Sequence, residues 1–230
     1  MSKKELFKYA FIKSLPVMFS YLFIAMAYGM LMQASGYDWY WALGICVLLY
    51  TGAFQFVLLS FFQTDASLVT VALTAFLMNS RQLFYSLSFM TDFRAMGWKK
   101  PYMICTLTDE TFAVNCSMEE LPDAQRRPAM FIVAVLCQSY WAAGTLVGSF
   151  LGRLIPFDLT GIDFCMTALF VIILIDQWEK GGTHGAALTG LIVGAVTLLI
   201  FGGSSFMLPA LLLTSAILLL LNREEAKKHG

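Results

Sequence analysis

A single arginine, Arg81, lies inside a long apolar stretch, which makes its side chain the first candidate for chemistry in this sequence. An unpaired arginine at the centre of a helix in lipid costs at least about 2.5–3.5 kcal/mol, so a chain keeps one only where it faces an ionic partner, a cavity or a substrate. Asn79 and Gln82 flank it, and Tyr85 shares its helix face. These residues predict a site for an anionic group, with the guanidinium as a forked donor. An ion pair that only joins helices is the alternative.

A second polar segment, Tyr50-Thr-Gly-Ala-Phe-Gln-Phe56, places Gly52 and Gln55 on one helix face. Glycine lets the backbone unwind or approach a neighbour closely. Gln55 brings a donor and an acceptor into an otherwise apolar span. It either belongs to a binding site or forms a hydrogen bond that joins helices, and both interpretations stay open.

The third polar segment, Thr106-Leu-Thr-Asp-Glu-Thr-Phe-Ala113, contains the adjacent acids Asp109 and Glu110. Adjacent residues on a helix point about 100° apart, so the two carboxylates cannot both face one site. One of them could pair with Arg81 or carry a proton. Alternatively, Thr108 caps a helix and both acids sit at the positive end of its dipole. The two interpretations are compatible, because transporters build sites at half-helix starts.

The amino-acid composition indicates that lipid surrounds these segments. The chain has 230 residues, of which 59% are hydrophobic and 13% are charged, whereas a soluble domain has roughly 25% charged residues. We therefore expect an all-α integral membrane protein, because lipid leaves no water to satisfy open backbone groups. The length predicts one transporter domain over 1–230, a polytopic bundle of about six to eight apolar segments, some of them broken or re-entrant. These segments are Leu15–Met32, Trp41–Phe62, Ser67–Met90, Tyr102–Cys116, Ala129–Leu151, Thr160–Trp178, Ala186–Gly202 and Phe206–Leu221.

Basic residues predict the orientation of the chain. The lysine-rich N-terminus, the Arg126-Arg127 pair and the C-terminal tail favour the cytoplasmic side, which makes the chain N-in and C-in. This count requires no net crossing between Ala66 and Cys116. Either both apolar segments in that region cross, which places Arg94, Lys99 and Lys100 outside, or both are broken or re-entrant, which keeps these charges inside. Charge bias favours the second route.

Small residues and missing motifs narrow the function. The Gly144-x-x-x-Gly148-x-x-x-Gly152 stripe predicts close helix packing, within this chain or against another copy in a homo-oligomer. The tryptophans lie mostly near segment ends, where aromatic belts form. The two histidines, His184 and His229, join no His/Glu or His/Cys cluster, and there is no P-loop. We therefore expect no metal, no cofactor and no enzymatic activity. The zero net charge suggests no nucleic-acid partner.

The three polar segments, in this order, resemble the AzlC family, the large subunit of bacterial branched-chain amino acid exporters. The matching residues are Tyr50–Phe56, Asn79–Tyr85 and Leu107–Ala113, and Ser14-Leu-Pro16 looks similar too. Family members often have Gly-Ala-Ser-Gln-Phe and Asp/Asn-x-Arg-His, where this chain has Phe54 and Gln82.

The resemblance implies efflux of valine, leucine, isoleucine or related amino acids across the bacterial inner membrane. It also implies a small membrane partner of the AzlD type. We therefore expect a secondary exporter whose site includes Gln55, Asn79, Arg81, Gln82, Tyr85, Asp109 and Glu110, supported by Gly52 and Thr108. Proton coupling is expected because a membrane acid can titrate. The alternatives are an exporter of another small organic solute and a membrane scaffold that transports nothing.

Overall fold

The computed structural model describes most of the chain and divides it into two compact units. It describes residues 1–64, 66–118, 120–154, 184–202 and 209–218, together with 171, 175, 178–179, 206 and 220; the side chains of Arg81, Leu83 and Phe84 lie outside the description. Unit 1 comprises Met1–Leu59 and Asn79–Ile162, and unit 2 comprises Ser60–Met78 and Asp163–Gly230. All regular structure in the described part is helical. The single transporter domain stays a prediction.

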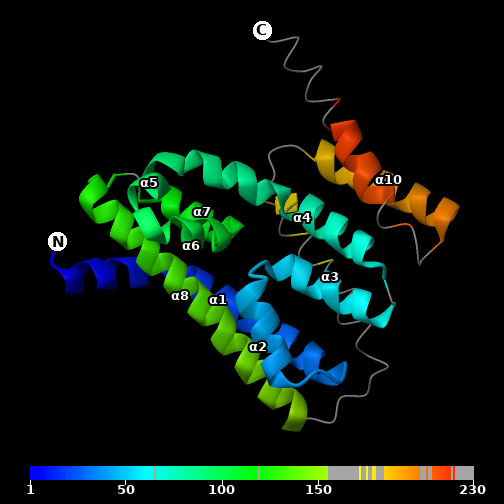
Figure 1. Cartoon of the computed structure of the whole chain (residues 1–230), viewed down its shortest axis with the longest axis horizontal. Helices are drawn as coiled ribbons and strands as arrows, with labels where there is room; N and C mark the ends of the chain where they lie inside the picture. Colours follow the sequence, from blue (N-terminus) through cyan, green and yellow to red (C-terminus); the bar gives the residue numbers. More distant parts are fainter. Residues whose placement is uncertain are drawn as a thin grey trace. The chain divides into compact units, whose positions relative to one another are not determined.

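Two long helices form the frame of unit 1 (Figure 1). Helix α1 runs over Lys3–Ala34 and helix α8 over Asp123–Leu154, and both are long and apolar enough to cross a membrane. Helix α1 begins well before the predicted apolar segment because Ser2 and Glu5 form a capping box. The predicted segments Leu15–Met32 and Ala129–Leu151 are thus the apolar middles of longer helices.

Helices α1 and α8 pack in parallel along the glycine stripe. A Cβ placed on Gly144 would lie 2.8 Å from the Ala25 Cβ, and one on Gly148 would lie 2.7 Å from the Met26 Cα. One on Gly152 would lie 3.2 Å from the Met30 Cα. Contacts that advance together on both helices require a parallel pair. The predicted close packing is therefore within the chain, and only glycine fits there.

The parallel arrangement gives unit 1 two distinct ends. The N-termini of both helices lie at one end, which we call the basic end because it carries the lysines of early α1 and the Arg126-Arg127 pair. Their C-termini lie at the other end, which we call the far end. There Arg153 pairs with Asp38 at 3.1 Å. Arg153, a basic residue away from the basic end, thus has an acidic neighbour.

A broken helical hairpin enters unit 1 from the far end. Helix α2 (Trp39–Leu48) starts with the Trp39 ring 6.3 Å from that of Phe150, near the end of α8. The helix breaks at Leu49–Thr51, and α3 (Gly52–Gln63) turns back, with the Phe56 ring 5.6 Å from that of Tyr28. The predicted apolar segment Trp41–Phe62 is therefore one of the broken segments and forms two helices. The chain reverses because the Leu49 carbonyl accepts from the Thr51 N–H instead of continuing the helical hydrogen-bond pattern, and Gly52 follows at once.

A second broken hairpin enters from the basic end. Helix α6 (Lys100–Cys105) begins beside the start of α8, where the Lys99 Nζ lies 4.0 Å above the Phe131 ring. The chain breaks at Thr106–Thr108, and α7 (Asp109–Cys116) returns toward the start of α8. The predicted segment Tyr102–Cys116 is thus broken, as expected, and Lys99 lies at the basic end.

Helix α4 joins the two units as one continuous helix, Leu68–Ser88. The Ser67–Met90 segment is therefore not broken, because that stretch contains neither proline nor glycine to interrupt the ladder, and its re-entrant course stays a prediction. Helix α5 (Met90–Ala95) and the 3₁₀ turn η1 (Gly97–Lys99) then lead into α6. Arg94, Lys99 and Lys100 all belong to this connection at the basic end.

Unit 2 contains the first half of α4 and two later apolar helices. Helix α10 covers Gly185–Phe201, and a further apolar helix covers Pro209–Leu218. Gly190 faces the second of these, since a Cβ there would lie 3.8 Å from the Thr214 methyl carbon. Most of the predicted segment Thr160–Trp178 and the whole C-terminal tail lie outside the described residues.

Candidate functional site

The tip of the basic-end hairpin meets the middle of α1 at a buried tyrosine. The Tyr21 hydroxyl lies 2.6 Å from the Thr108 Oγ1 and donates a hydrogen bond of 2.8 Å to the Glu110 Oε2. Thr108 caps α7 as predicted, because its hydroxyl accepts from the Thr111 N–H at 3.3 Å. The helix start and its dipole therefore stabilise the Glu110 carboxylate, and α1 holds that carboxylate in place.

The tip of the far-end hairpin is held by Gln55. Its amide Nε2 donates to the Leu49 carbonyl at 2.7 Å, and its Oε1 accepts from the Trp141 indole N–H at 3.0 Å. Trp141 also covers the start of α3, since a Cβ on Gly52 would lie 2.8 Å from the indole Cη2. The sequence left open whether Gln55 serves a site or joins helices. Its described contacts join the break to α8.

The two hairpin tips meet in one buried cluster. The Tyr21 and Trp141 rings make an edge contact, with centroids 5.2 Å apart and planes at 79°. Tyr50, in the first break, is 6% exposed and interacts electrostatically with Glu110 and with the Tyr21 hydroxyl. Two helix breaks, a carboxylate and several hydroxyls thus share the middle of unit 1. Such an arrangement can bind a small molecule that carries both charges.

The structure places the predicted site residues unevenly. Gln55, Gly52, Thr108 and Glu110 belong to the cluster. Asp109 is half-buried and precedes Glu110 on a different face of α7. Three of the predicted residues on α4 are half-buried, namely Asn79, Gln82 and Tyr85. The side chain of the fourth, Arg81, is outside the described part of the structure.

Helix α4 reaches the basic-end hairpin through aromatic rings. Tyr85 stacks on Phe112 with ring centroids 4.5 Å apart, and Phe89 contacts the same ring at 5.5 Å. Arg81 precedes Tyr85 by one helical turn. The backbone of Arg81 is thus on the helix that packs against α7, which carries Glu110.

Three members of the cluster, Tyr21, Trp141 and Tyr50, were not among the predicted site residues. Trp141 is only 4% exposed in the middle of α8, so it does not belong to an aromatic belt. A phenol or an indole in an apolar run gives no sequence signal by itself, because both are common in membrane helices. Tyr50 was inside the motif, and its place next to Gly52 was the one available signal.

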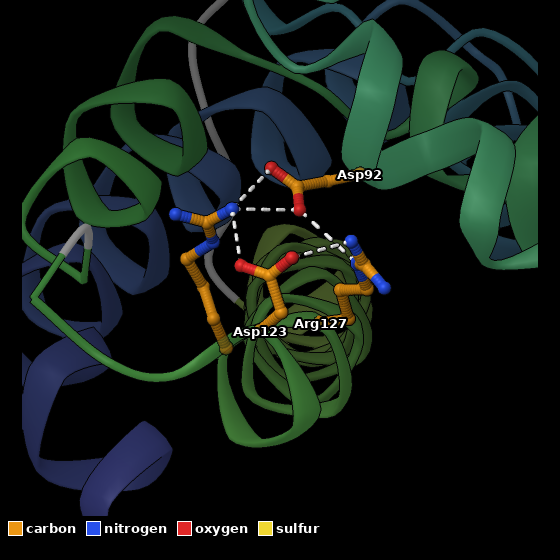
Figure 2. Close-up of polar contacts among 4 residues, drawn as sticks. Asp92, Asp123 and Arg127 are labelled. Carbon is orange, nitrogen blue, oxygen red and sulfur yellow. Dashed lines mark hydrogen bonds and ion pairs between the residues drawn. The ribbon is translucent and has the colours of Figure 1, made fainter.

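A second polar cluster, outside the hairpin tips, closes the basic end (Figure 2). The Asp92 carboxylate of α5 accepts from Arg126 at 2.8 Å and 3.0 Å and from the Arg127 Nε at 3.2 Å. Asp123 pairs with the same two arginines at 3.1 Å and 2.7 Å. This charge cluster, Asp92, Asp123, Arg126 and Arg127, fastens α5 to the first turn of α8.

The described residues contain no metal-type group of three or more His, Cys, Asp or Glu side chains. The cysteines they include, Cys46, Cys105, Cys116 and Cys137, are free thiols. The site is therefore built from hydroxyls, amides, carboxylates and helix ends.

Comparison with known proteins identifies the family. Residues 16–155 match the family model described as AzlC protein, and this range includes both hairpins. An uncharacterized membrane protein of Helicobacter pylori is 36% identical over 89% of this chain and 90% of its own length. The branched-chain amino acid transport protein AzlC of Bacillus subtilis is 33% identical over 89% of this chain and 80% of its own.

The inner membrane protein YgaZ of Escherichia coli is a more distant relative, 28% identical over 80% of this chain and 77% of its own. No solved structure matches the chain significantly. The family model covers more than half of the 230 residues, and the relatives cover most of them. The chain is a member of the AzlC family.

Proposed function

We propose that this protein is a secondary exporter of branched-chain or similar amphipathic amino acids across the bacterial inner membrane. Membership in a transport family and the name of the Bacillus relative support an amino-acid substrate. The observation that carries the proposal is the Glu110 carboxylate, held by Tyr21 where two broken hairpins meet. Polar groups at broken helices near the middle of a bundle are typical of secondary transporters.

The cluster supplies groups for each part of such a substrate. Glu110 binds the substrate amine or a proton, and Asp109 is the alternative carboxylate for this role. Arg81 binds the substrate carboxylate or clamps one of the acids. Neutral hydrogen bonds come from Gln55, Asn79, Gln82 and Tyr85, and apolar side chains receive the aliphatic part of the substrate. An acid that can titrate supports proton coupling.

The parallel frame supports an orientation as well. The basic end faces the cytoplasm by the positive-inside rule, so α1 and α8 both run outward. The far-end hairpin then opens toward the outside, and the basic-end hairpin opens toward the cytoplasm. A small membrane subunit of the AzlD type completes the exporter.

Efflux from amino-acid-loaded cells tests the proposal. Cells that express the chain with its partner should release valine faster than cells without it, and a substrate panel should show competition by leucine and isoleucine. The variants Arg81→Ala, Asp109→Asn and Glu110→Gln should each abolish resistance to toxic leucine analogues while the protein stays in the membrane. The matched control Tyr40→Phe, at an exposed position, should keep it. Full resistance in all three variants would remove this site assignment.

A further inference from the structure

The helix break in the far-end hairpin exposes a backbone carbonyl at the end of α2 and backbone N–H groups at the start of α3. Only the carbonyl has hydrogen-bond partners among the described residues. The Leu49 carbonyl at the end of α2 accepts from the Gln55 amide at 2.7 Å and from the Thr51 N–H at 2.7 Å. The first N–H groups of α3, those of Gly52, Ala53 and Phe54, form no hydrogen bond with any residue in the described ranges. The N–H groups at the positive end of the α3 dipole, beside the Trp141 ring, therefore lack an acceptor among these residues.

The two threonines at the hairpin tips behave differently. Thr108 caps α7, since its hydroxyl accepts from the Thr111 N–H. Thr51 holds the same place before α3, and its carbonyl accepts from the Gln55 N–H at 3.1 Å. Its hydroxyl is nevertheless buried without a hydrogen-bond partner among the described residues. A threonine directly before a helix normally caps it through its hydroxyl. The Thr51 hydroxyl does not, so it is free to donate a hydrogen bond to another acceptor.

Tyr50 adds a second unpartnered hydroxyl at the same break. Its side chain is 6% exposed, and the Oη has no hydrogen-bond partner within the described part of the chain. Tyr50 interacts electrostatically with Glu110 and with Cys137, and its hydroxyl also interacts with that of Tyr21 without meeting the geometry of a hydrogen bond. A buried polar group without a partner is costly, so each such group in a native structure calls for a ligand, a water or an ion.

We propose that the start of α3, with the hydroxyls of Tyr50 and Thr51, is the binding subsite for the α-carboxylate of the transported amino acid. Its free backbone groups are hydrogen-bond donors at a positive helix end, and both hydroxyls can donate as well, which favours an anion. Glu110, on the opposite hairpin tip, lies within electrostatic range of Tyr50 and receives the α-amine. The inference rests on the proposed function, and it leaves Arg81 the role of clamping an acid.

Competition by a decarboxylated analogue tests this subsite. Everted membrane vesicles from cells that express the full chain with its partner take up labelled valine, and unlabelled valine or isobutylamine competes. Isobutylamine has the amine and side chain of valine but no carboxylate. Tyr50→Phe and Thr51→Val should each raise the inhibition constant of valine about tenfold, because each loses a hydrogen bond to a charged group. The constant for isobutylamine should change less than twofold.

Two further variants complete the experiment. Thr51→Ser, which keeps the hydroxyl, should restore the affinity for valine. Tyr140→Phe, whose hydroxyl lies 3.1 Å from the Ser14 Oγ and not in the break, should change neither constant. The subsite is wrong if the constants for valine and isobutylamine rise equally, or if the valine constant is unchanged in both Tyr50→Phe and Thr51→Val.

A separate result concerns the proposed function. If the wild-type vesicles take up no valine, export of branched-chain amino acids is wrong. The subsite is then decided by thermal unfolding of the purified full chain with a panel of amino acids and their decarboxylated amines. A carboxylate-dependent stabilisation that Thr51→Val removes and Thr51→Ser keeps supports the subsite. Its absence from the wild type overturns the subsite.

Discussion

Tyr21 connects more members of the cluster than any of the predicted site residues does. Its hydroxyl reaches both Thr108 and Glu110, and its ring packs on Trp141. It therefore sets the position of the acid relative to both long helices. The structure also separates the adjacent acids, because Glu110 faces Tyr21 and its neighbour on α7 points elsewhere.

Removing this hydroxyl should weaken transport without unfolding the protein. Tyr21→Phe keeps the edge contact with Trp141 but loses the hydrogen bond to the carboxylate. A hydrogen bond to a charged group contributes about 1.5–3 kcal/mol, so we expect roughly a tenfold to hundredfold loss in valine efflux. The measurement is the initial efflux rate at equal membrane abundance, with Tyr40→Phe as control. An unchanged rate would mean that Glu110 needs no positioning by α1.

At the scale of helices, backbone contact between α1 and α8 fixes the frame. The sequence predicted the glycine stripe on α8 but not its partner, which includes Gly29 of α1. Neither helix can shift sideways without losing this contact, and the hairpin tips are anchored to the same two helices. The packing of the frame therefore determines the geometry of the site.

A single methyl group at the stripe should destabilise this frame. A Cβ on Gly148 would clash with the Met26 backbone, which cannot move aside as a flexible side chain can. We expect Gly148→Ala to lower the free energy of unfolding by about 1–3 kcal/mol. The matched substitution Gly194→Ala, in α10, meets nothing within 4 Å and should be neutral or stabilising by up to about 1 kcal/mol. Thermal unfolding in detergent distinguishes them, and equal melting temperatures would contradict the close packing.

At the scale of the whole molecule, charged groups distinguish the basic end of unit 1 from the far end. The charge cluster at the basic end holds α5 against α8, and α5 continues from α4. The positive-inside rule predicted the side of Arg126 and Arg127 but not their shared acid, Asp92. Asp92 lies more than thirty positions earlier in the chain, so only the tertiary fold brings it to them.

Neutralising that acid should cost more than neutralising its exposed neighbour. Asp92→Asn removes the buried carboxylate from two partly buried arginines and leaves them only the exposed Asp123, which should cost about 3 kcal/mol of stability. The Asp123 side chain is 57% exposed, so Asp123→Asn should cost at most about 1 kcal/mol. Thermal unfolding in detergent measures both effects. A larger loss for Asp123→Asn would show that Asp92 is not the centre of the cluster.

Cysteine labelling in intact cells tests the orientation. In a background without native cysteines, Asp38→Cys and Arg153→Cys should both react with a membrane-impermeant maleimide, because both positions lie at the far end. Lys4→Cys and Asp123→Cys should react only after the membrane is made permeable. Labelling of Asp38→Cys and Arg153→Cys from opposite sides would contradict the parallel frame. Labelling of Lys4→Cys from outside would reverse the predicted orientation.

By itself the sequence determined the properties that depend on composition and on neighbouring residues. Apolar length predicted the helices, the Thr108 cap followed from a threonine directly before two acids, and the polar segments led to the AzlC family. The tertiary structure decided what depends on distant residues. The Trp41–Phe62 segment turns back on itself because Gln55 satisfies the broken backbone and Trp141 holds Gln55 in place. Whether an apolar run crosses or turns back depends on such long-range hydrogen bonds, and hydropathy alone contains no information about them.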